Sequence, residues 1–278
     1  MADASTGGAI ESVAFYFSPH EDDWQLFMNP PAFRDVRDGV KSVFVHVTAG
    51  DAGLGIGTGG RKHPLYLARE NGAESAIRFM ADSDYRPPAQ TQVTAPALNG
   101  HAVRRVAYRN TVAYFLRLPD GSPEGTGYAD TGFQSLKRLA DSQIDMLTAI
   151  DGSASYRSWS DVVATLRALL DFERTSAPAF ALHVPELDRG RNPNDHADHA
   201  MTAKAVLAAA EGLAARRCHY VCYASGSLPE NLTGQDRDMK CAVYAVTLAG
   251  VLALDHQTAW RHYDEMFVGR SYFRMEAG

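Results

Sequence analysis

Apolar runs of two kinds alternate along the chain, and together they predict an α/β protein. Continuous runs rich in Val and Phe, at residues 12–18 and 40–48, are typical of buried strands, whereas residues 65–81 carry apolar positions at helical spacing. Strands that alternate with helices predict a Rossmann-like, mainly parallel sheet flanked by helices, with inserted loops and C-terminal helices. Downstream, the pattern predicts strands at 103–108, 112–118, 179–184 and 219–224, and helices at 133–150, 160–173, 197–215, 243–254 and 260–267.

The length of 278 residues is compatible with one domain over residues 1–278. Residues 84–99 and 120–132 are rich in Pro, Ala, Gly and Ser and have few periodic apolar positions, so they predict loops near a site. We expect a segment of about 84–132 to form an inserted lid or platform for a large substrate. Residues 233–278 are expected to form a helical tail.

Composition narrows the class of protein without naming a function. A hydrophobic content of 45%, a net charge of −6 and a pI near 5.9 are ordinary for a soluble protein and give no general attraction to nucleic acid. Three cysteines lack the number and spacing of a disulfide framework. Residues 1–11 lack a leader pattern, and no apolar run reaches 18 residues, so we expect a cytoplasmic protein with no membrane span.

The first chemical signal is Ser18-Pro19-His20-Glu21-Asp22-Asp23, which directly follows a predicted strand. In open α/β sheets, ligands bind beyond the carboxyl ends of strands, and a divalent cation is a simple way to hold several ionised carboxylates together there. Imidazole with carboxylate suits zinc or a similar metal such as Fe²⁺. The alternative is that residues 21–23 are a solvated N-cap run, and on this stretch alone both interpretations stay open.

The second signal is Asp195-His196-Ala197-Asp198-His199, about 175 residues later at the start of a predicted helix. His196 and His199 are three apart, so both rings lie on roughly one face, and Asn194 and Asp195 are candidate N-caps. A helix N-terminus favours neutral imidazole, which can ligate a metal. Asp198 could accept the other ring N–H of a neighbouring histidine and so fix its tautomer. Pairs of surface histidines are the alternative for this motif taken by itself.

Together, the two motifs resemble the LmbE-like (PIG-L) family of metal-dependent N-acetylglucosamine deacetylases. The family's His-Pro-Asp-Asp and His-Pro-Asp-His motifs stand here as His20-Glu21-Asp22-Asp23 and His196-Ala197-Asp198-His199, with each proline replaced. Arg69-Glu70 with Glu74 is similar to a third family motif, and Thr48-Ala49-Gly50 to a fourth. The run from Ser18 to Asn29 looks most like the subgroup that deacetylates glycopeptide-antibiotic (teicoplanin and A40926-type) pseudoaglycones.

The resemblance implies a role for each matched position. His20, Asp23 and His199 would bind one Zn²⁺, with Fe²⁺ as the alternative metal. Asp22 would be the general base toward the attacking water, and His196 would stabilise the oxyanion. Arg69 is a candidate for contact with a sugar hydroxyl, with a salt bridge to Glu70 or Glu74 as the alternative, whereas Glu21 is expected to be a solvated or capping residue.

The implied activity is hydrolysis of the acetamide of an N-acetylglucosaminyl group on a glycopeptide pseudoaglycone, which releases acetate and a free amine. A small-molecule or thiol-precursor N-acetylglucosamine conjugate is the alternative substrate. A second alternative is a non-enzymatic or nucleotide-binding α/β protein that uses Gly55-Ile56-Gly57-Thr58-Gly59-Gly60, which matches GxGxxG literally. That match is weak, because the fingerprint requires glycines that end a strand and open a helix.

Overall fold

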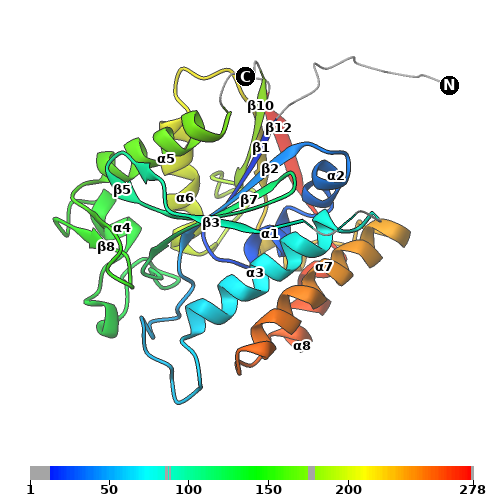
Figure 1. Cartoon of the computed structure of the whole chain (residues 1–278), viewed down its shortest axis with the longest axis horizontal. Helices are drawn as coiled ribbons and strands as arrows, with labels where there is room; N and C mark the ends of the chain where they lie inside the picture. The colour runs from blue at the N-terminus through cyan, green and yellow to red at the C-terminus, as the bar shows by residue number, and fades with distance from the viewer. Residues whose placement is uncertain (1–12, 85–86, 88, 175–178, 277–278) are drawn as a thin grey trace.

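An eight-stranded sheet forms the centre of the protein (Figure 1). The structure is a computed structural model, and it describes residues 13–84, 87, 89–174 and 179–276. The strand order of the sheet is β12-β11-β10-β1-β2-β7-β6-β3. The five strands from β11 to β7 run parallel, and the outer strands β12, β6 and β3 are antiparallel to their neighbours. The mainly parallel sheet predicted from the sequence is confirmed. The strands are β1 (Val13–Ser18), β2 (Lys41–Thr48), β3 (Gln92–Thr94), β6 (Arg104–Tyr108), β7 (Thr111–Leu118), β10 (Phe180–Pro185), β11 (Arg216–Tyr220) and β12 (Phe273–Glu276).

Helices cover both faces of this sheet (Figure 1). One face packs against α4 (Leu136–Ala140), α5 (Trp159–Arg174) and α6 (Ala197–Ala209), and the other against α1 (Asp23–Phe27), α2 (Pro31–Arg37), α3 (Leu65–Ala81) and α7 (Gly234–Ala253). Every residue of β1 is buried, which explains why a central strand reads as a continuous apolar run instead of an alternating one. The smaller elements are α8 (Trp260–Tyr263), the 3₁₀ turns η1 (Ala129–Thr131) and η2 (Tyr223–Ser227), the π-helical turn η3 (Asp264–Val268), and the hairpins β4 (Ala97–Leu98) with β5 (His101–Ala102) and β8 (Leu147–Thr148) with β9 (Ser155–Tyr156).

The predicted helix at 133–150 is wrong over most of its length. The chain forms only the short α4, which the Ser135 side chain caps by accepting from the Arg138 N–H, and Ser142 then adopts a φ of 55°. Farther on, residues 147–148 pair with β9. A local hairpin thus replaces the helix that the apolar spacing of the sequence predicts.

The expected inserted segment at 84–132 needs correction. Its central part supplies β3, β6 and β7, and β7 pairs with β2 in the middle of the sheet. Tyr114 and Phe115 of β7 are buried, so this part is core and not a lid. Only the stretches outside the strands remain candidates for a lid or platform, and residues 85, 86 and 88 lie outside the described residues. Any leader in residues 1–12 likewise falls outside them.

The C-terminal tail contains the predicted helices and one strand that the sequence did not predict. Helices α7 and α3 pack closely, and the lack of a side chain at Gly72 permits this. A Cβ atom on Gly72 would lie 2.6 Å from the Thr247 carbonyl oxygen. After η3, the chain returns as β12 and covers the edge of β11. The short β12 thus becomes the edge strand on this side of the sheet, and β11 is paired on both sides. No helix of the described residues is long and apolar enough to cross a membrane.

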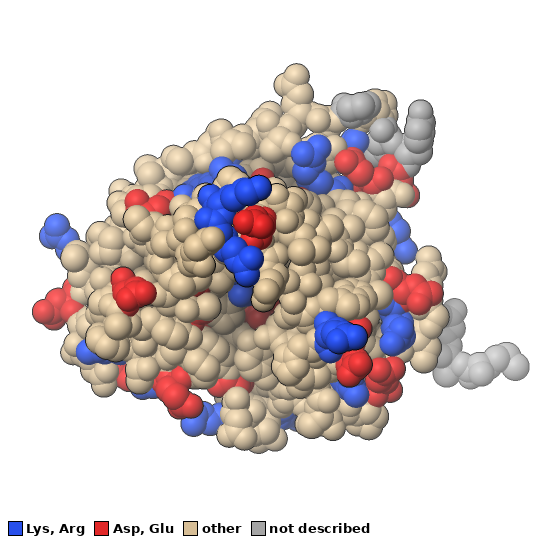
Figure 2. All heavy atoms as spheres, turned by 90° about the horizontal axis from the view of Figure 1, so that it is seen from below, with Lys and Arg blue, Asp and Glu red and all other residues tan. Residues whose placement is uncertain are grey.

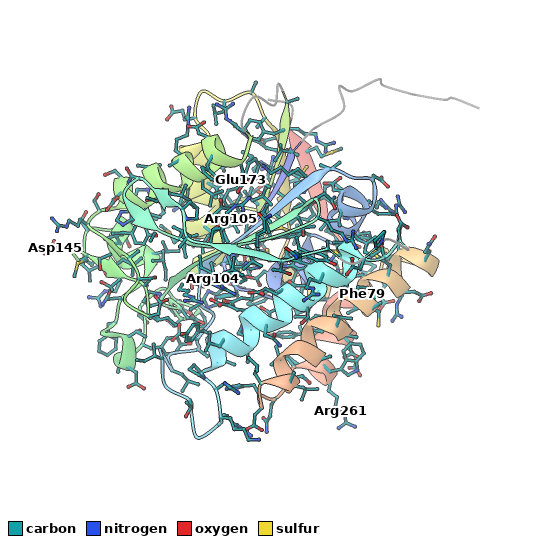
Figure 3. The ribbon with its side chains drawn as sticks, in the orientation of Figure 1. Phe79, Arg104, Arg105, Asp145, Glu173 and Arg261 are labelled. Atoms are coloured by element: carbon teal, nitrogen blue, oxygen red, sulfur yellow. The ribbon has the colours of Figure 1, made fainter. Side chains whose placement is uncertain are left out.

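A buried carboxylate joins α5 to the sheet. Glu173, which is 1% exposed, accepts from Arg105 Nε at 2.7 Å and from the Tyr114 hydroxyl at 2.6 Å, and it lies 2.7 Å from Lys41 Nζ (Figure 3). Burial acts to raise the pKa of this carboxyl, but the bonds to Arg105, Lys41 and Tyr114 outweigh it and lower the pKa. The ionised form therefore stabilises the fold.

We expect Glu173→Gln to lower the free energy of unfolding by about 3 kcal/mol at pH 7, because it removes one partner of a buried ion pair. The contribution of a carboxyl with a lowered pKa is complete above its unfolded pKa of about 4.3 and disappears as the pH falls through its folded pKa. The difference from the unsubstituted protein should therefore shrink toward pH 3. Urea denaturation at both pH values measures it, and the exposed Glu211→Gln is the control; a difference independent of pH would contradict this assignment.

Candidate metal centre at the carboxyl edge of the sheet

Both sequence motifs lie at the same edge of the sheet. β1 and β10 pair in parallel, with Tyr16 opposite His183, so their carboxyl ends point the same way. The first motif follows β1 directly, and the second opens α6 after β10. The rings of His20 and His199 lie with centroids 5.6 Å apart, and those of His20 and His196 lie 4.8 Å apart. The fold therefore brings together residues that are far apart in the chain.

His20, Asp23 and His199 form a buried cluster whose ligand atoms lie within 4.8 Å of one another. His20 Nδ1 is 3.1 Å from Asp23 Oδ2, and His199 Nε2 is 3.3 Å from Asp23 Oδ1. A tetrahedral zinc with ligands at 2.0–2.1 Å sets its ligand atoms about 3.3 Å apart, so these separations fit such an ion. The Nε2 atom of His199, which faces Asp23, is buried without a hydrogen-bond partner among the described residues, and a metal site explains this.

His199 is held by Asp195. The carboxylate of Asp195 accepts from His199 Nδ1 at 2.9 Å, which leaves the lone pair of Nε2 directed at the cluster. The sequence predicts that Asp198 accepts the second ring N–H of a histidine, and it predicts only a helix-capping role for Asp195. Asp198 instead lies with Oδ2 3.5 Å from His20 Nε2 and accepts the Gly121 N–H at 2.8 Å. Each of the two histidines thus has its own supporting carboxylate nearby.

His196 presents a hydrogen-bond donor to the site. It is the N-cap of α6, in place of the predicted Asn194 or Asp195, and its Nδ1 accepts from the Asp198 N–H at 3.2 Å. Burial, together with the charge of His20, lowers the pKa of His196 to about 4, so the ring is neutral at neutral pH. A neutral ring whose Nδ1 accepts must carry its proton on Nε2.

The field around the cluster is strongly negative. Burial disfavours charged rings at His20 and His199, but Asp23 beside His20 and Asp195 beside His199 outweigh it and raise the pKa of both rings. Burial likewise acts to raise the pKa of Asp23, and the two rings instead lower it. A field that favours positive charge between these groups also favours a divalent cation.

Asp22 and Glu21 both contact Arg69, which is not paired as the sequence suggested. Arg69 Nε donates to Glu21 Oε2 at 3.1 Å, and its Nη2 donates to Asp22 Oδ1. The alternative for Arg69, a salt bridge to Glu70 or Glu74, is not formed, because Arg117 binds Glu70 and Arg104 binds Glu74. Glu21 is 1% exposed and not a solvated cap, and burial raises its pKa to about 8 against the pull of Arg69.

Sequence reasoning assigned no role to Asp120 or Asp51. Asp120 follows β7, and its carboxylate lies 3.7 Å from His196 Nε2 and 3.9 Å from His20 Nε2. Asp51 follows β2 and accepts both the Asp120 N–H and the Gly55 N–H. Both lie just after parallel strands, which is the signal that could have identified them.

Two other features are structural in the described residues. Burial raises the pKa of Cys222, near His199, to about 12, and its thiol donates to the Tyr220 carbonyl. The glycine-rich stretch 55–60 lies between β2, which ends at Thr48, and α3, which begins at Leu65. Its glycines neither end the strand nor open the helix, so the geometry of a dinucleotide fingerprint is not formed.

A crevice of about 90 Å³ begins at this site. Glu21, Asp22 and Arg69 line one end, and its walls are Leu65, Tyr244, Thr247, Leu248, Val251 and residues 257–259. A larger groove of about 650 Å³ runs past Asp195 along α6. Figure 2 shows basic and acidic side chains interspersed around a hollow near the middle of one face.

Several solved structures are similar to this chain at low sequence identity. The N,N'-diacetylchitobiose deacetylase from Pyrococcus horikoshii, complexed with an inhibitor, is 13% identical, with a TM-score of 0.52 over 96% of this chain and 85% of that one. A triple mutant of a deacetylase from the teicoplanin biosynthetic pathway (13% identical; 92% and 88% covered) has a TM-score of 0.49. The A40926 pseudoaglycone deacetylase (15% identical; 92% and 86% covered) has a TM-score of 0.46. No family model and no curated protein matches the sequence.

Fold and site together define a class: an α/β protein with a histidine and carboxylate cluster beyond its central parallel strands. The chitobiose deacetylase match shows that this chain shares the fold of that enzyme. The resemblance drawn from the two motifs is therefore confirmed at the level of the fold.

His199→Ala should lose bound zinc, whereas His196→Ala should retain it, because His199 Nε2 faces Asp23 and His196 Nε2 carries a proton. Inductively coupled plasma mass spectrometry of the purified variants measures zinc per chain. Equal loss in both variants would contradict the division of roles between the two histidines.

Asp195→Asn should weaken zinc affinity by about 10- to 100-fold, since an amide supports the His199 ring less well than a carboxylate. Competition with a chromophoric chelator gives the dissociation constant. Asp188→Asn, in the same loop but at the surface, is the matched control and should leave the affinity unchanged. An unchanged affinity in Asp195→Asn would exclude the support role.

Proposed function

We propose that this chain is a metal-dependent deacetylase of the LmbE-like family that hydrolyses the acetamide of an N-acetylglucosaminyl group. The observation that carries the proposal is the convergence of His20, Asp23 and His199, with Asp22 beside the cluster and the His196 donor opposite. The shared fold of the chitobiose deacetylase supports it.

His20, Asp23 and His199 would hold one zinc ion or Fe²⁺, because neutral imidazole and carboxylate ligands suit either metal. A bound ion would supply Lewis-acid chemistry toward water and the amide carbonyl. Three protein ligands are the number that a catalytic zinc site uses while keeping a position open. Asp195 and Asp198 orient the two histidines from outside the cluster.

Asp22 acts as the general base. Its side chain is 22% exposed, in contrast to the buried Asp23, so an entering water can reach it. Asp22 accepts the proton of the attacking water as the C–O bond forms at the amide carbon. It then returns this proton to the leaving nitrogen as the C–N bond breaks, which yields acetate and the free amine.

His196 stabilises the oxyanion of the tetrahedral intermediate. Its Nε2–H is fixed as a donor by the hydrogen bond from the Asp198 N–H to Nδ1. A fixed donor of this kind costs no reorganisation during the reaction, and loss of one typically lowers turnover by about 10²- to 10³-fold. Arg69, at the mouth of the crevice, is placed to contact a sugar hydroxyl with donors not used by Glu21 and Asp22.

The acceptor that carries the sugar is proposed to be a glycopeptide-antibiotic pseudoaglycone. The support is the sequence run from Ser18 to Asn29, which resembles that subgroup. A small-molecule or thiol-precursor conjugate presents the same N-acetyl group and is the alternative. Mass-spectrometric detection of deacetylated product across conjugates of increasing size decides between them: preference for the smallest would exclude the glycopeptide.

Asp22→Asn should lower kcat by at least about 10²-fold with zinc content unchanged, because an amide cannot accept the proton of water. The assay is amine release from an N-acetylglucosamine conjugate, run beside a zinc determination on the same sample. Full activity of the zinc-loaded variant would refute Asp22 as the base.

A further inference from the structure

Glu21 is one of two positions, with Ala197, at which this chain has another residue where the family motifs have proline. It stands between the ligand His20 and the base Asp22. Its side chain is 2% exposed, and its ligand atoms are not part of the converging cluster of His20, Asp23 and His199. A buried acidic residue at this position needs a partner, and it has one.

One guanidinium joins Glu21 to Asp22. Arg69 Nε donates to Glu21 Oε2 at 3.1 Å, while Nη2 of the same group donates to Asp22 Oδ1. The guanidinium is planar and its N–H groups form a rigid fork. A contact that fixes Nε therefore also fixes the direction of Nη2, and with it the position of the Asp22 carboxylate.

Gly50 makes room for this arrangement. A Cβ atom there would lie 2.6 Å from Glu21 Oε2 and 2.8 Å from Arg69 Nε. The residue also has a φ of 50°, which glycine adopts without strain. The loop after β2 thus closes over the contact between Glu21 and Arg69, while Asp22 stays at the mouth of the crevice.

We propose that Glu21 is a positioning residue: it anchors Arg69, and Arg69 holds Asp22 in the orientation in which it accepts the proton of water. This inference rests on the proposed function. Asp22 is the N-cap residue of α1, but its side chain makes no cap hydrogen bond, so among the described residues Arg69 is the contact that orients it. A displacement of about 1 Å in a reacting group can cost about 10²-fold in rate.

The test is a double-mutant cycle on Glu21 and Arg69. Glu21→Leu removes the acceptor and should lower kcat by about 10- to 100-fold. Glu21→Gln keeps an acceptor oxygen and should stay within about 3-fold of the unsubstituted enzyme. In an Arg69→Ala background, Glu21→Leu should have no further effect, because residues that act through one another are not additive.

Zinc content and Tm are measured for every variant, so that loss of metal or fold is separated from loss of positioning. If Glu21→Leu does not fold, Arg69→Lys takes its place, since it keeps the charge and loses the fork; its kcat should fall similarly. Full kcat in Glu21→Leu or Arg69→Lys, or additive losses in the double variant, would overturn the proposal.

A crystal structure of Glu21→Leu gives a readout that does not depend on activity. Arg69 should swing away from Asp22 in this variant and stay on it in Glu21→Gln. An Arg69 that still binds Asp22 in Glu21→Leu would overturn the positioning role, even if no N-acetyl substrate were cleaved. Failure of the unsubstituted, zinc-loaded protein on every N-acetyl conjugate would refute the proposed function and not this contact.

Discussion

The parallel pairing of β1 with β10 is the constraint on which the site depends. It places the turn after β1 beside the start of α6, so that His20 and His199, which are far apart in the sequence, share one cluster with Asp23. Both strands are buried on both faces, which leaves only their carboxyl ends for polar side chains. The core thus determines where the chemistry can lie.

The site concentrates acidic groups, and each has a specific compensation. Asp195 is bound by His199, Asp198 by the Gly121 N–H and Asp22 by Arg69. The hydrogen bonds at Nδ1 give His196 and His199 different tautomers. The lone pair of His199 Nε2 points into the cluster, whereas His196 Nε2 carries a proton, so one ring suits ligation and the other suits donation.

Local pattern predicted the fold where burial and periodicity agree. The helix at 65–81 has the predicted bounds, and the central strands were found because they are continuous apolar runs. Prediction failed where a partner far along the chain decides the conformation. Residues 273–276 became a strand through pairing with β11, which requires tertiary contact that a local pattern does not contain. Residues 147–148 instead form a short hairpin with β9, a local pairing that the apolar spacing did not indicate.

The sequence by itself determined the residue types of the site and their local spacing: three residues from His20 to Asp23 and three from His196 to His199 fix which side chains can share a turn. Only the tertiary structure decided which partners they meet. In the folded chain, Arg69 binds Glu21 and Asp22, and not Glu70 or Glu74, which are nearer in the sequence. The fold also places Asp120 beside the histidines. The reason is that residues adjacent on α3 point to different neighbours, so the contacts of a buried charge follow from packing and not from distance along the chain.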